Sequence, residues 1–225
     1  MGQGQHFDHR EVVTRLTVER LSSYLERTDR DKRAALRLYD WNIRASGALI
    51  EDIGRLEILF RNSVDMRLVD YCERRGWRTE WYQHDQWFTP SGSKDIREAR
   101  ERARRAGGRE RRGKVIAEFS FGFWKFLCTR HYLTSLWVPA LAGAFPQHPN
   151  GPDPRAVRSD VHNRMTRLHK LRNRVAHHEP IHNRDLGSDW HALVEIAGWI
   201  CPDTRKWIVA RSRTMEILAQ RREVL

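Results

Sequence analysis

The chain has 225 residues, 40% of them hydrophobic, and a formal net charge of +12 with an isoelectric point near 10.3. This length and composition predict a single globular domain, and the charge indicates an anionic partner, with nucleic acid ahead of a membrane surface. Arginine supplies 35 of the 41 cations, which favours phosphate recognition, although a GC-rich genome would produce the same bias.

Signals for targeting and for disulfides are weak. Cys72, Cys128 and Cys201 are too few and too scattered for a disulfide framework or a zinc finger. The first ten residues lack the apolar core of a signal peptide, and no apolar run approaches the roughly 20 residues that a membrane-spanning helix needs. We therefore expect a soluble, reduced, cytoplasmic protein that has no membrane partner.

Helical periodicity dominates the chain, and no segment shows the alternation typical of a strand. A first helix is expected over about 12–25, ending before Thr28. Asp29 or Asp31 can cap a second helix, which Ser46-Gly47 can break or kink. A third helix is expected from Leu49 to near residue 76.

The remaining segments also predict helices, separated by two loops. The segment 76–93 holds three tryptophans and is predicted to be irregular, and the segment 145–154 holds four prolines and is predicted to be a loop within the fold. Helices are expected over about 94–106, 114–130, 132–143, 154–178, 189–200 and 203–223, with Gly107-Gly108 as a break. The prediction is an all-α single domain over residues 1–225, with 1–10 as a flexible N-terminus.

The predicted helix after residue 154 carries one apolar stripe at three- and four-residue spacing, formed by Val157, Val161, Met165, Leu168, Leu171 and Val175. Arg172 lies four residues after Leu168 and therefore falls inside this stripe. An unpaired charge at this position would be costly. Arg172 consequently needs an acidic partner, with Glu57 and Asp65 as candidates, or the phosphate of a ligand.

The most informative segment ends the same helix and reads Leu171-Arg172-Asn173-Arg174-Val175-Ala176-His177-His178-Glu179-Pro180. Arginine binds phosphate through a rigid fork of donors, and histidine exchanges protons near neutral pH, which together suit RNA cleavage without a metal. Pro180 predicts that the helix ends near His178. His177 lies about 140° around an ideal helix from Arg172. The two side chains can meet only through a frayed last turn or across a dimer.

A competing pattern overlaps this segment, because His178-Glu179-Pro180-Ile181-His182 has the letters H-E-x-x-H of zinc proteases. That metal site needs both histidines one turn apart on a continuous helix. Pro180 lies inside that turn, where its ring clashes with a carbonyl and removes a donor. We therefore expect no metal site here.

Four sequence blocks, taken together, point to a known family. Arg172-Asn173-x-x-x-His177 matches the R-[polar]-x-x-x-H motif of HEPN ribonucleases. Preceding it, in order, are Leu38-Tyr39-Asp40-Trp41-Asn42, Glu57-x-x-x-Arg61-Asn62 and Phe119-Ser120-Phe121-Gly122-Phe123-Trp124. With the extended block from Arg172 to Ile181, the chain resembles the Abi-like (abortive infection, AbiD/AbiF-type) family of bacterial phage-defence proteins over about residues 15–220.

The resemblance implies a HEPN-like helical bundle with additional helices and a Trp-rich loop insertion. It implies a metal-independent endoribonuclease without a cofactor, acting in phage defence or as a toxin. By position, Arg172 and His177 would be the catalytic pair, Asn173 would orient them, and His178 would be candidate catalytic support. Some family members are associated with a small structured RNA, so the target RNA and such an RNA are both expected partners.

The resemblance also implies a homodimer. HEPN nucleases use two motifs, whereas this chain has one complete motif. Arg61-Asn62 echoes the pattern but has Met66 where a histidine would be needed. The expected active site is therefore a composite of two copies, with the 2′-OH of RNA as the nucleophile.

Two groups of basic side chains are candidates for RNA contact. The segment 97–112 contains eight arginines against three glutamates, some of which can pair at helical spacing. We expect the RNA backbone to contact Arg97, Arg100, Arg104, Arg105, Arg109, Arg111 and Arg112, together with Arg164, Arg167, Lys170 and Arg174 of the long helix. The alternative function is a non-catalytic RNA-binding protein that forms a ribonucleoprotein with a structured non-coding RNA.

The aromatic side chains admit two interpretations. Those of the Trp-rich loop could stack on unpaired bases, but a loop fixed to the core by its aromatic rings is favoured; they are Trp77, Trp81, Tyr82, Trp87 and Phe88. Phe121, Phe123 and Trp124 are expected in the core or in a dimer interface, with Gly122 allowing close helix packing.

Overall fold

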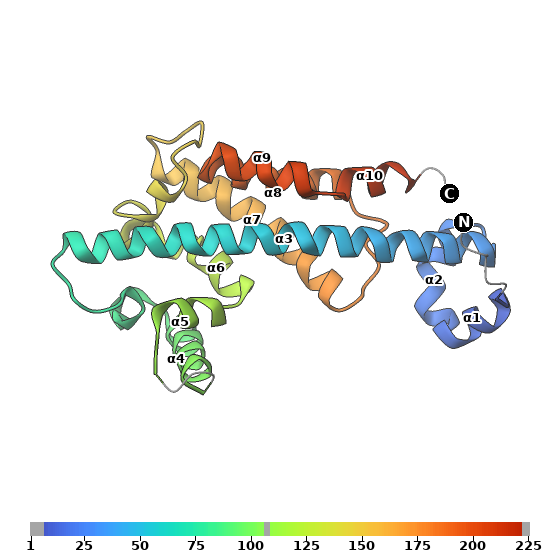
Figure 1. Cartoon of the computed structure of the whole chain (residues 1–225), viewed down its shortest axis with the longest axis horizontal. Coiled ribbons are helices and arrows are strands. Elements are labelled where there is room, and N and C mark those ends of the chain that lie inside the picture. The colour runs from blue at the N-terminus through green and yellow to red at the C-terminus, as the bar shows by residue number, and fades with distance from the viewer. Residues whose placement is uncertain (1–6, 106–108, 222–225) are drawn as a thin grey trace.

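The computed structural model describes residues 7–105 and 109–221, and within these ranges it contains helices and no strand, which confirms the all-α class. A single long helix, α3, runs through the whole molecule (Figure 1). The α-helices are α1 His9–Leu16, α2 Val18–Arg27, α3 Lys32–Arg74, α4 Pro90–Arg105, α5 Arg112–Glu118, α6 Phe121–Leu127, α7 Pro154–Ala176, α8 Leu186–Ile200, α9 Pro202–Arg211 and α10 Thr214–Ala219. Short helical turns are η1 Trp81–Gln83, η2 Asp85–Trp87, η3 Arg130–Tyr132, η4 Leu133–Trp137 and η5 Leu141–Ala144.

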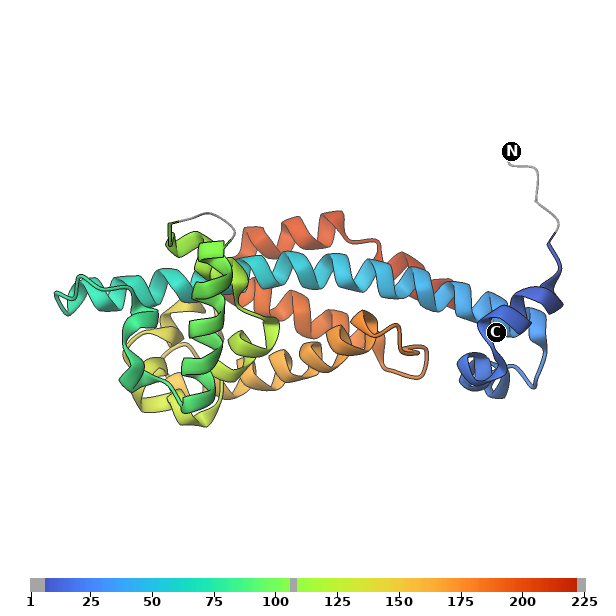
Figure 2. The ribbon, with the colours of Figure 1, turned by 90° about the horizontal axis from the view of Figure 1, so that it is seen from below.

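The elements are distributed along α3 in three groups. Helices α1 and α2 lie at its N-terminal end, α4 to α6 lie near its C-terminal end, and α7 to α10 lie along its length (Figures 1 and 2). None of the helices in the described ranges is long and apolar enough to span a membrane.

Helix α3 replaces two predicted helices, so the expected break at Ser46-Gly47 was wrong. Asp31 caps α3 by accepting from the N–H groups of Arg33 at 2.8 Å and Ala34 at 3.2 Å. One glycine in a helix costs about 1 kcal/mol, which a continuous buried stripe on both sides outweighs. That stripe includes Leu38, Trp41, Ala45, Leu49, Ile53, Leu56 and Phe60.

The N-terminal prediction of one helix was also wrong, because Thr17 divides it. Thr17 has a positive φ of 66° and its hydroxyl accepts from the N–H of Arg20, so α1 ends and α2 begins at this residue. Of the predicted flexible segment 1–10, residues 1–6 lie outside the described residues, and α1 already begins at His9.

The Trp-rich segment is fixed to the core, as the favoured interpretation predicted. Trp81, Tyr82 and Phe88 are buried, and Trp81 Nε1 donates to Asp65 Oδ1 at 2.7 Å. The loop is shorter than predicted, since α4 begins at Pro90, where the missing N–H of proline costs nothing in a first helical turn. The predicted break at Gly107-Gly108 lies outside the described residues.

The predicted helix 114–130 is two helices, because Phe119 is extended and Ser120 starts a new helix by accepting from the N–H of Phe123 at 3.2 Å. Phe121, Phe123 and Trp124 are buried in the core. The predicted helix 132–143 is a series of 3-10 and π turns. The 145–154 loop is confirmed and is held to α8 by Gln147 N–H, which donates to Trp199 O at 3.0 Å.

The last predicted helix, 203–223, is divided at Ser212. Asp52 of α3 is fully buried, and both Ser212 Oγ and Thr214 Oγ1 donate to its Oδ2, at 2.5 and 2.7 Å. Because a buried carboxylate must be hydrogen-bonded, the chain turns toward it there, and α9 and α10 become separate helices.

Candidate active site

Helix α7 presents the motif residues at the edge of a buried stripe. The six apolar side chains predicted to form the stripe are all buried, and α7 packs through them against α3, α6 and α8. Arg172 and Asn173 are half-buried beside the stripe, whereas His177 is exposed at the end of the helix. The predicted apolar stripe of α7 is therefore confirmed.

Glu57 of α3 carries a carboxyl group whose pKa is affected by the charge of Arg172. Burial raises the pKa of Glu57, and the charges of Arg172 and Arg61 act in the opposite direction. The other candidate, Asp65, is engaged by Trp81 and lies 3.6 Å from Arg112. Among the described residues, Arg172 makes no hydrogen bond and no direct ion pair. Its guanidinium therefore keeps its donors for another anion.

His169 joins the site although the sequence analysis did not select it. The Asn173 side-chain amide lies 3.4 Å from His169 Nε2, and the imidazole stacks on Phe121 at 6.0 Å between ring centroids. Burial, followed by the charges of Lys125 and Arg172, lowers the pKa of His169. A neutral imidazole can accept from the amide, so His169 orients Asn173. The available signal was its position four residues before Asn173 on the same helix face.

The end of α7 is regular up to His177. The His177 N–H still donates to Asn173 O at 3.0 Å, so the last turn is not frayed. Arg172 and His177 therefore keep the separation of about 140° that an α-helix imposes on residues five apart. The frayed last turn that would bring the two side chains together within one copy is therefore not observed.

A Schellman motif follows His177. The N–H groups of His178 and Glu179 donate to Val175 O at 3.0 Å and Arg174 O at 2.8 Å, which satisfies the last free carbonyls of the helix. His178 has a φ of 55°, in the left-handed region, and its carbonyl accepts from Arg20. Its imidazole is exposed, so the contacts of His178 are those of a helix terminator.

The H-E-x-x-H letters do not form the helical site of a zinc protease. The helix ends at Ala176, before the first histidine of the pattern. His178 is exposed, whereas His182 is fully buried and lies 3.1 Å from Ser23 Oγ. Among the described residues, no group of three or more His, Cys, Asp or Glu side chains is arranged to hold a metal ion.

Three of the four cations of α7 that were predicted to bind RNA have partners within the protein. Arg164 binds Glu195 at 2.7 Å, Arg167 binds the buried Asp189 at 2.6 Å, and Arg174 donates to Pro180 O at 2.8 Å. Lys170 is exposed beside a surface hollow of about 560 Å³ that Arg164 and Arg167 also line. Of the four residues predicted to bind RNA on this helix, Lys170 is thus the one with no ionic partner among the described residues.

The arginines of the segment 97–112 also fall into two groups, those with ionic partners in the protein and those without. Arg100 and Arg104 share Glu110, with distances of 2.9 and 2.7 Å. Further pairs join Arg102 to Glu118 at 3.0 Å, Arg105 to Glu101 at 3.4 Å, and Arg112 to Asp65 and Glu80. Among the described residues, Arg97, Arg109 and Arg111 are exposed and have no ionic partner. These three side chains carry the charge that is free for an external phosphate.

Comparison with protein-family models, with curated proteins and with solved structures gives no significant match to this chain. The chemistry of the site must therefore be argued from its residues. A guanidinium without a direct partner can bind a phosphate group, and an exposed imidazole can exchange protons with a group beside it.

Proposed function

We propose that the chain is a metal-independent endoribonuclease of the HEPN superfamily, resembling Abi-like proteins, and that it acts in the cytoplasm as a phage-defence effector or toxin. The observation that carries this proposal is the state of Arg172. The residue is half-buried and its charge acts on Glu57, yet it has no direct ionic partner among the described residues. Half-buried arginines are normally paired, so a substrate phosphate is the natural partner.

In the proposed mechanism, Arg172 binds the scissile phosphate and stabilises the charge that develops on its oxygens. His177 takes the proton from the RNA 2′-OH, and the 2′-oxygen attacks phosphorus. The bond from phosphorus to the 5′-oxygen breaks, and His177 of a second copy protonates that oxygen. The products are a 2′,3′-cyclic phosphate and a 5′-hydroxyl, and DNA is not cleaved because it lacks the 2′-OH.

An uncovered strip on α3 supports the homodimer that this mechanism requires. Ile43, Ile50 and Ile58 are 47%, 37% and 49% exposed, and Ile58 directly follows Glu57. Exposed apolar side chains repeated along one helix are typical of an interface. A second copy on this strip would bring its own Glu57 and Arg172 toward those of the first.

The dimer is tested by Ile58→Asp, with Val138→Asp as a control at an exposed valine on another surface. We expect Ile58→Asp to give a monomer by light scattering and to lose RNA cleavage, while the control stays dimeric and active. A dimer that survives Ile58→Asp together with full activity would remove this surface from the proposal.

The catalytic assignment is tested on labelled single-stranded RNA in EDTA. Wild type should produce ends with a 2′,3′-cyclic phosphate, His177→Ala should lose at least about 100-fold in rate, and the control His191→Ala, another exposed histidine, should cleave normally. Cleavage by His177→Ala at the wild-type rate would contradict the mechanism, and loss of wild-type cleavage in EDTA would contradict its independence of metal.

The unpaired surface cations favour a second candidate, a non-catalytic RNA-binding protein that holds a structured RNA. Arg97, Arg109, Arg111 and Lys170 suit backbone contact whether or not RNA is cleaved. Sequencing the RNA that co-purifies with wild type and with His177→Ala separates the two functions. A discrete RNA present in equal amounts in both, without any cleavage by wild type, would favour the second candidate.

A further inference from the structure

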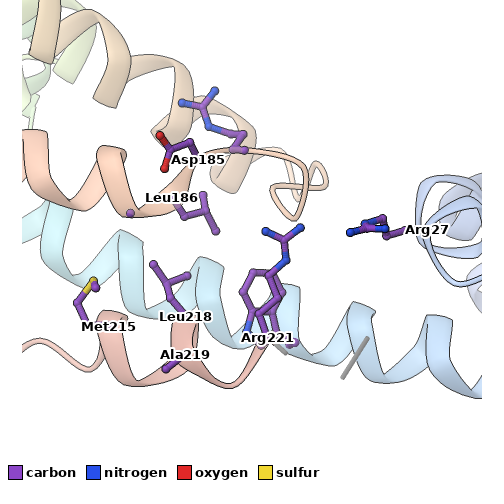
Figure 3. A pocket seen from close by; sticks show the side chains of 10 residues that line it. Arg27, Asp185, Leu186, Met215, Leu218, Ala219 and Arg221 are labelled. Atoms are coloured by element: carbon purple, nitrogen blue, oxygen red, sulfur yellow. The ribbon is translucent and has the colours of Figure 1, made fainter. Parts of the chain in front are cut away.

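A pocket of about 680 Å³ lies away from Arg172, where α2, the start of α8 and α10 approach one another. Figure 3 shows Arg27, reaching in from α2, on the opposite side of the pocket from Arg221, which follows α10. Leu186 and Leu218 line the pocket between these charges and Asp185. The volume lies in the range of about 300–1,000 Å³ that is typical of small-molecule sites.

Arg27 and Arg221 both line this pocket, and neither is paired with a carboxylate among the described residues. Among the described residues, neither guanidinium makes a hydrogen bond or an ion pair, and Arg221 Nε is buried without a partner. The Arg221 guanidinium lies over the Trp41 ring, 5.5 Å from its centroid, which fixes its position. Burial, followed by the charge of Arg27, lowers the pKa of Arg221, so the two like charges repel each other. Such an arrangement is stabilised by an anion.

The other ionisable groups at the pocket do not supply that anion. Arg184 adds a third guanidinium, whose partner Asp189 is shared with Arg167. Asp185 is the one carboxylate among the lining residues, and it accepts from Ser188 N–H at 3.1 Å to cap α8.

His182 lies close to the same cations and is fully buried. Burial, followed by the charges of Arg221, Arg27 and Arg174, lowers the pKa of His182 to about 4, so it is neutral at physiological pH. The described residues that line the pocket therefore carry three guanidinium groups and one carboxylate, which caps α8.

We propose that this pocket binds a phosphorylated ligand of nucleotide size, with the phosphate between Arg27 and Arg221 and the apolar part of the ligand on Leu186 and Leu218. Two guanidinium groups can hold a phosphate through charge-assisted hydrogen bonds. The aliphatic side chains can cover a sugar or base without selecting it by hydrogen bonds. This site is independent of RNA cleavage at Arg172.

Calorimetric titration of the full chain with AMP, adenosine and inorganic phosphate tests the proposal. AMP should bind with a saturable signal and raise the melting temperature, adenosine should not bind, and phosphate should bind more weakly than AMP. Arg27→Gln and Arg221→Gln should each weaken AMP binding about tenfold or more, because each removes charged donors. The control Arg130→Gln removes an exposed charge elsewhere and should change nothing.

Arg27 is exposed and makes no hydrogen bond or ion pair among the described residues, so its variant should fold even if loss of Arg221 disturbs Trp41. A 5′-phosphorylated oligonucleotide that displaces AMP, when its 5′-hydroxyl counterpart does not, would assign the phosphate to an RNA end. Failure of that displacement would assign it to a free nucleotide. Equal binding of AMP and adenosine, or AMP binding unchanged in both arginine variants, would overturn the proposal whatever the outcome at His177.

Discussion

The C-terminal half of α7 and the segment 97–112 are both rich in arginine, but they use the charge differently. In the segment 97–112, glutamates of the same region neutralise part of a solvated surface, as Glu110 does for two arginines. In α7, carboxylates of α8 hold Arg164 and Arg167, and Arg172 is left half-buried without a direct partner. The proposed phosphate site therefore rests on a half-buried arginine without a partner and not on the number of cations.

The largest effect that we expect is that of Arg172→Gln on the rate of RNA cleavage. Loss of this guanidinium should slow RNA cleavage by about 100-fold or more, because it removes a donor to the transition state. The control Arg164→Gln, which breaks the pair with Glu195, should leave cleavage nearly unchanged and lower the melting temperature instead. Equal loss of activity in the two variants would mean that the absence of an ionic partner does not identify the catalytic arginine.

Arg167→Gln should show that this arginine of α7 is structural. It leaves Asp189, which is fully buried, with Arg184 as its remaining ionic partner, so we expect a loss of about 1–3 kcal/mol in the free energy of unfolding. Urea denaturation measures this change. A tenfold loss of RNA affinity with an unchanged free energy of unfolding would instead indicate that Arg167 contacts RNA.

Replacing Arg97, Arg109 and Arg111 together by Gln tests the unpaired charges of the segment 97–112. RNA affinity should fall about tenfold, and the salt dependence of binding should become shallower by up to about 0.7 per lost contact. A matched triple variant, Arg100, Arg104 and Arg105 to Gln, removes the same charge from paired positions. It should affect RNA binding less and stability more. A larger loss of RNA affinity in the variant at the paired positions would contradict the assignment of RNA contact to the unpaired arginines.

The smallest expected effect is that of His178→Gly. A left-handed conformation costs a non-glycine residue about 1 kcal/mol, so glycine at this helix-terminating position should stabilise the fold by at most about that amount. Cleavage should remain within about threefold of wild type. A loss of tenfold or more in rate, with the same melting temperature, would restore His178 as catalytic support.

The sequence predicted best what depends on local spacing. The stripe from Val157 to Val175, the end of α7 before Pro180 and the burial of the Trp81 region are all found in the structure. Each of these features follows from periodicity, from backbone sterics or from the cost of exposing large aromatic side chains.

What the sequence could not predict depends on contacts between distant segments. Ser46-Gly47 stays helical because α3 is packed on both sides of it, and Ser212 breaks a helix because Asp52, 160 residues earlier, needs donors. The same limit applies to the site. Nothing in the local pattern shows that Arg167 binds Asp189 while Arg172 remains without a direct partner, because α8 supplies those carboxylates after the motif has ended.

The continuity of α3 also has a mechanical consequence. At 1.5 Å per residue, its 43 residues form a rod of about 64 Å that cannot bend sharply without losing backbone hydrogen bonds. A change in the angle between α2 and α3 is therefore confined to the turn at 28–31, where Asp29 and Arg30 both have positive φ. Arg27 immediately precedes this turn and lines the pocket. A rotation of α2 about the turn would therefore move Arg27 and change the shape of the pocket.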